Sequence, residues 1–240
     1  MNLKSRSKRT RTALLALAVG TVVALVLGAA VPTYSINTRQ TGRQDSRGFP
    51  LYYTDDRGLH LRLCETGTRQ CLGATRGDLV APEGEAFYWM ATATIRSNRG
   101  PLDVEFALEA AFGGARGLQP IVFDRIRIRG HLGRAGRYVL DHPYGSTRFR
   151  AITPAEQRNV DFTVDRACSL ERGGTCNGRI DNFLRALNPP KGYIGFGERR
   201  TLVRGGTVRN SLVLRTGDGN VIGQTNRFAI VGKRFILQNR

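Results

Sequence analysis

The stretch DVEFALEAAF, residues 103–112, decides the fold class of this chain. Its alanine, leucine and glutamate residues favour a helix by intrinsic propensity. Its apolar residues, however, recur at every second position: Val104, Phe106, Leu108, Ala110 and Phe112. Glu105 and Glu109 stand between them, so charged and apolar side chains alternate with the period of a half-buried strand. We therefore predict a strand here.

The segment IVFDRIRIR, residues 121–129, alternates in the same way. Two isoleucines face one side and three arginines face the other: Ile126 and Ile128, then Arg125, Arg127 and Arg129. Three such arginines form a row at about 7 Å spacing and repel one another unless acids or an anionic ligand intervene. Pairing with Glu105 and Glu109 on the neighbouring strand is the favoured interpretation. The functional alternative is a docking site for an anionic polymer or lipid head group.

Most of the remaining chain consists of short apolar runs between turns rich in glycine, of which the chain has 29. Residues 59–64 alternate cleanly after a turn signal, and residues 217–220 are a strong hairpin signal. Further strands are expected at residues 86–95, 138–140, 148–152, 159–165, 201–204, 210–216 and 226–231.

Two short helices are expected among these strands, a turn at 154–157 that Thr153 caps and a segment at 181–187. The sequence therefore predicts a mostly β fold. We expect a β-sandwich-like ectodomain at 48–152 with a smaller β-rich C-terminal part at 153–240, all after an N-terminal hydrophobic helix.

The N-terminal segment has the features of an export signal. Residues 13–31 are apolar and uncharged, and five basic residues precede them. At about 1.5 Å per residue such a helix spans about 28 Å, close to the hydrocarbon thickness of a bilayer. Residues 1–31 are predicted to be either a cleaved signal peptide or an uncleaved signal anchor, and residues 32–47 to be a polar linker. The protein is then exported, and is either membrane-anchored at the outer face or secreted.

Four cysteines support the same location: Cys64, Cys71, Cys168 and Cys176. An even count in an exported chain indicates disulfides. Three connectivities are open, and the short spacings favour Cys64–Cys71 and Cys168–Cys176. The spacings do not fit a zinc knuckle.

The chain has a large excess of basic residues, 37 against 19 acidic ones, for a net charge of +18. Without the five that precede the apolar segment, 32 basic residues still face 19 acids. Such an excess attracts anionic polymers or lipid head groups. Because only four of the basic residues are lysines, a general arginine bias of the proteome is the alternative explanation.

Several short features together resemble a family of uncharacterised exported bacterial β proteins. They are the aromatic opening Gly-Phe-Pro-Leu-Tyr-Tyr at 48–53, the aromatic run at 86–91, Arg-Ile-Arg-Ile-Arg at 125–129, Gly-x-Tyr at 136–138 and His-Pro-Tyr-Gly at 142–145. The resemblance covers residues 48–240 and implies export and a β fold, without a particular activity. Residues 205–207 depart from it, since they read Gly-Gly-Thr where the family has Gly-Ser-Pro.

The sequence contains no motif that specifies an enzyme. His60, His131 and His142 lack a metal-ligand spacing, and no Gly-x-Ser-x-Gly elbow is present. We predict no cofactor, no metal site and no nucleic-acid partner, and we identify no catalytic residue. The expected function is that of an exported, non-enzymatic cell-surface or secreted β protein that interacts with cell-wall or other anionic surface components. The alternative is an exported hydrolase whose active site carries no recognisable motif.

Overall fold

The computed structural model describes residues 39–40, 43–65, 68–71, 85–113, 119–171, 173–176, 178 and 180–237. The predicted leader, residues 1–31, and most of the predicted linker lie outside these residues. Within the described ranges, no helix has the length and apolarity that crossing a bilayer requires.

The described chain is built from strands, with one short helix. The first eight strands are β1 (Arg39–Gln40), β2 (Tyr53–Thr54), β3 (His60–Arg62), β4 (Glu85–Ser97), β5 (Gly100–Gly113), β6 (Gln119–Gly130), β7 (Gly136–His142) and β8 (Gly145–Ala151). After helix α1 (Pro154–Arg158) come β9 (Val160–Cys168), β10 (Arg185–Ala186), β11 (Gly197–Arg204), β12 (Leu212–Thr216), β13 (Val221–Thr225) and β14 (Arg227–Arg234).

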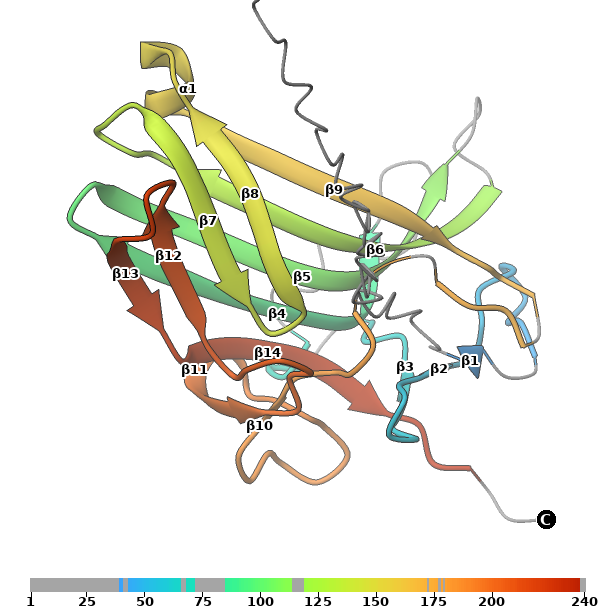
Figure 1. The fold of residues 1–240 in the computed structure, drawn as a ribbon. Coiled ribbons are helices and arrows are strands. Elements are labelled where there is room, and N and C mark those ends of the chain that lie inside the picture. Colours follow the sequence, from blue (N-terminus) through green and yellow to red (C-terminus); the bar gives the residue numbers. More distant parts are fainter. Residues whose placement is uncertain are drawn as a thin grey trace, which may run out of the picture. The chain divides into compact units, whose positions relative to one another are not determined.

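The strands form two antiparallel sheets. The larger one, here the main sheet, has the order β1-β2-β3-β14-β4-β5-β6-β9, with β11 paired to β14 and β10 paired to β11. The second sheet has the order β13-β12-β7-β8 and lies across β4, β5 and β6 of the main sheet (Figure 1). The fold is thus mostly β and sandwich-like, as the alternation predicted.

The alternation at 103–112 determines which face of the main sheet packs against the second sheet. In the β5–β6 ladder, Phe106 lies opposite Ile126, and both are buried in the core between the sheets. Glu105 lies opposite Arg127 on the other face. The core also holds Trp89, whose indole N–H donates a 3.0 Å hydrogen bond to the carbonyl oxygen of Leu184. This bond satisfies the one polar group of a fully buried side chain.

Strands from both predicted segments, 48–152 and 153–240, interleave in both sheets. In the main sheet, β9 pairs with β6 and β14 pairs with β4; in the second sheet, β12 pairs with β7. The two segments therefore share one core.

The prediction of the first short helix is confirmed and that of the second is wrong. Thr153 caps α1 in a capping box with Glu156. Residues 181–187 form no helix, because tertiary hydrogen bonds take their backbone groups. The Asp55 carboxylate accepts from the N–H of Phe183, and the N–H of Asp56 donates to the carbonyl of Asp181. These contacts outweigh a weak local helix propensity.

Both predicted disulfides are present, Cys64–Cys71 and Cys168–Cys176. Each closes a local loop, and the structure contains no free cysteine. These bonds are compatible with an extracellular location.

Candidate functional site

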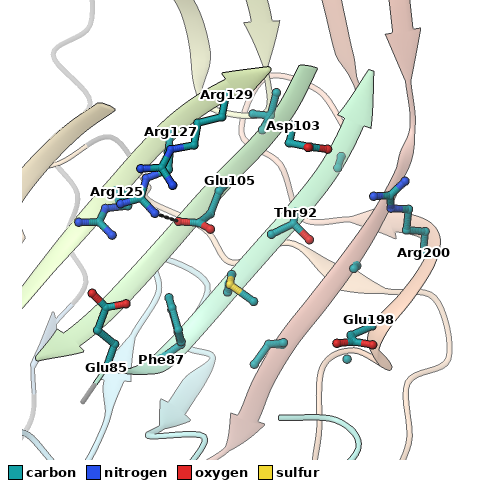
Figure 2. Close-up of a pocket in the computed structure, with 16 residues that line it drawn as sticks. Glu85, Phe87, Thr92, Asp103, Glu105, Arg125, Arg127, Arg129, Glu198 and Arg200 are labelled. Atoms are coloured by element: carbon teal, nitrogen blue, oxygen red, sulfur yellow. Dashed lines mark ion pairs between the residues drawn. The ribbon is translucent and has the colours of Figure 1, made fainter. Parts of the chain in front are cut away.

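A groove with a volume of about 520 Å³ lies on the face of the main sheet that points away from the second sheet. Figure 2 shows that its side chains come from several strands, with Arg125, Arg127 and Arg129 along β6 and Glu105 facing them from β5. Arg200 lies on the opposite side of the groove, on β11. The alternation of β5 and β6 brings these polar side chains to one face, as predicted.

The three arginines of the predicted row are each paired with an acid. Arg127 lies 3.6 Å from Glu105, and Arg129 lies 3.3 Å from Asp161 on β9. Arg125 has two partners, Glu109 at 2.9 Å and Asp165 at 2.7 Å. The charge of the row is therefore balanced within the protein. This geometry favours the ion-pair interpretation of the row over the docking interpretation.

Glu109 has the most unusual environment among these acids. Its side chain is fully buried beneath the groove, and one oxygen accepts a hydrogen bond from Arg125. Burial raises the pKa of Glu109, the Arg125 charge lowers it, and the neighbouring Glu85 raises it again, to about 8. Since the carboxyl group is not exposed, it cannot touch a substrate in the groove.

Apolar side chains also line the groove, and one of them, Phe87, lies beside Glu85 (Figure 2). Phe87, Met90 and Val231 line it and belong to a small buried cluster that includes the Cys64–Cys71 disulfide. Tyr193 packs against this cluster. The groove thus combines apolar side chains with charged ones, several of which are paired within the protein.

The three histidines do not converge. His60 contacts the hydroxyl of Thr54 at 2.7 Å, on the β2–β3 hairpin. His142 is buried in the turn between β7 and β8, where its Nε2 lies 3.1 Å from the Thr147 hydroxyl and its Nδ1 accepts from the N–H of Tyr144. Nowhere in the described ranges do three or more His, Cys, Asp or Glu side chains gather as a metal site would need.

Sequence reasoning missed two of the acids that compensate the arginine row. Asp161 and Asp165 lie on β9, which was expected as a strand, but its pairing with β6 was not. The signal was available, since Asp161, Thr163 and Asp165 occupy alternate positions and form the polar face of that strand. Predicting that β9 pairs with β6 would have required the order of strands in the sheet, which no local sequence pattern encodes.

No family model, curated protein or solved structure matches this chain.

Proposed function

We propose that this chain is an exported, non-enzymatic cell-surface or secreted protein that interacts with cell-wall or other anionic components outside the cytoplasm. The observation that carries the proposal is charge that the protein cannot neutralise internally. Residues 32–240 contain 32 basic side chains and 19 acidic ones, so 13 basic groups would remain even if every acid were paired.

The ion pairs of the structure support this argument. Nine of the ion pairs among the described residues use seven arginines. In these pairs, Asp141 is shared by Arg209 and Arg215. Since basic groups outnumber acids by 13 in residues 32–240, a basic excess is left to interact with solvent or with an anionic partner.

The environment of Glu109 supports a role without catalysis. A carboxyl with a pKa near 8 would be a candidate general acid if it lined a cleft. Glu109 instead lies under Arg125 with no exposed surface, where it serves the internal charge network.

Salt-dependent binding tests this proposal. The ectodomain should bind polyphosphate, used as a model anionic polymer, with a log affinity that falls linearly as log salt concentration rises. The variant Arg127→Gln/Arg129→Gln should bind nearly as well as the unmodified protein, because both arginines are already paired. Absence of binding by the unmodified protein would contradict the proposal. Loss of binding in this variant, with the fold intact, would show that the row of Arg125, Arg127 and Arg129 is the docking site after all.

A further inference from the structure

The outward face of the β10–β11 pair combines like charges with exposed leucines. Arg185 on β10 lies directly opposite Arg204 on β11. One position further in, Ala186 lies opposite Val203, and both are buried. The N–H of Leu187 then donates to the carbonyl of Leu202, which continues the same ladder. Because side chains alternate along strands, the two arginines and the two leucines share the outward face.

The arginines of this face are incompletely balanced: the charge of Asp55 raises the pKa of Arg185, but it is opposed by three nearby arginines and by burial. Two further arginines, Arg57 and Arg234, act electrostatically on Arg185 together with Arg204. None of the four forms an ion pair with any residue that the structure describes. Like charges opposite each other on neighbouring strands destabilise a sheet unless a counter-charge is present.

The guanidinium group of Arg185 lacks a hydrogen-bond acceptor at one of its nitrogens. Its Nε is buried and donates no hydrogen bond. Burial lowers the pKa of Arg185, and the charge of Arg204 lowers it further. A buried guanidinium nitrogen without an acceptor is costly, so nothing among the described residues compensates this charge fully.

The leucines make the face amphipathic. Leu187 is 44% exposed and Leu202 is 42% exposed, although both are large and apolar. On the adjacent strand β14, Arg227 lies opposite Leu202. The two leucines therefore lie next to arginines in two directions. Arg185 and Arg204 are their neighbours on the same strands, and Arg227 faces Leu202 from β14.

We propose that the outward face of β10 and β11 docks on the head groups of an anionic phospholipid surface. Lipid phosphates accept hydrogen bonds from Arg185 and Arg204, and the two leucines enter the boundary between head groups and acyl chains. A soluble anionic polymer would satisfy the arginines but would leave the leucines in water, so the leucine pair selects the lipid surface. This inference rests on the proposed function and adds the site and the partner to it.

Vesicle binding tests the proposal with the unit that begins at Tyr34, because that unit contains the entire core. The probes are vesicles of phosphatidylcholine alone and of phosphatidylcholine with phosphatidylglycerol. The unmodified unit should bind only the anionic vesicles. Arg185→Gln/Arg204→Gln should bind them about 30-fold more weakly, which is about 2 kcal/mol at about 1 kcal/mol per arginine. Leu187→Ser/Leu202→Ser should bind about tenfold more weakly with an unchanged salt dependence.

The matched control is Arg137→Gln/Arg150→Gln. These arginines also lie opposite each other, on β7 and β8, and the substitution removes the same charge. Arg150, however, has a partner in Glu156. The control should bind anionic vesicles within about twofold of the unmodified unit, since each distant surface charge adds little at physiological salt.

The results separate this inference from the proposed function. Suppose that the unmodified unit binds polyphosphate and anionic vesicles, but the arginine variant and the leucine variant both bind as well as the control. The docking face then lies elsewhere, so this inference is wrong while the proposed function stands. If the leucine variant binds vesicles normally and the arginine variant loses polyphosphate too, the partner is a polymer and the lipid assignment fails. If the unmodified unit binds neither probe, the proposed function fails.

Discussion

At the scale of single residues, Arg125 and Glu109 show how the main sheet tolerates charge in its interior. The Arg125 guanidinium has two acceptors, Glu109 from one neighbouring strand and Asp165 from the other, and it also lies 4.8 Å from the ring of Phe123. Because Asp165 remains a partner, Arg125 stays paired even when Glu109 is protonated. The network therefore does not require two ionised acids around one arginine.

The raised pKa of Glu109 predicts a pH-dependent stability. Between the ordinary value of 4.5 and the folded value of about 8, the folded protein keeps a proton that the unfolded chain has lost. The free energy of unfolding should therefore fall as pH rises through this window, by several kcal/mol at most, since one pKa unit corresponds to about 1.4 kcal/mol. Glu109→Gln should remove this slope.

Urea unfolding at pH values below, within and above the window measures this effect, and the fluorescence of Trp89, the one tryptophan in the chain, reports it. Glu105→Gln is the matched control, because Glu105 lies on the same face of β5 and pairs with Arg127 at the groove surface. If Glu109→Gln keeps the slope of the unmodified protein, Glu109 is ionised when folded and the argument is wrong.

At the scale of elements, local alternation predicted some pairings and could not predict others. The β5–β6 hairpin follows from two alternating segments joined by a short connection, so pairing of the arginine row with Glu105 and Glu109 was expected from sequence; the structure gives the individual pairs, Glu105–Arg127 and Glu109–Arg125. The β10–β11 pair was not expected, because β10 is only two residues long and carries no period. Its segment was assigned to a helix, and the arginine pair that it forms with β11 became visible only in the structure.

The two disulfides stabilise different parts of the fold, so the effect of removing each one can be predicted separately. The Cys168–Cys176 bond ties the end of β9, and Cys64–Cys71 packs with the apolar side chains Phe87, Met90 and Val231. Replacing either pair with alanine should lower the free energy of unfolding by about 2–3 kcal/mol, the value that the chain-entropy model gives for loops of this size.

Peptide mapping without reduction provides the control for these variants. It should yield both local pairs from the unmodified protein. A link between residue 64 or 71 and residue 168 or 176 would show that the assignment is wrong.

At the scale of the whole molecule, the charge excess and the predicted leader point to the same location. If residues 1–31 direct export, a reporter fused after Arg240 should be active only outside the cytoplasm. The same fusion with the five basic residues that precede the apolar segment changed to glutamate should lose this orientation. Reporter activity in the cytoplasm from the unmodified fusion would contradict export, and the first residue of the mature protein would distinguish a signal peptide from an anchor.

The position of β14 in the main sheet has a consequence for how the chain acquires its structure. Although β14 comes last among the described strands, it lies between β3 and β4 and also pairs with β11. Thr92 and Ala229, which lie opposite each other in this ladder, are far apart in sequence, so their pairing is slow to form. Until β14 has been synthesised, β4 presents an apolar edge with unpaired backbone groups, the kind of surface that promotes aggregation. The chain is therefore vulnerable from the synthesis of β4, which ends at Ser97, until that of β14, which begins at Arg227, and a holding chaperone would protect it during that interval.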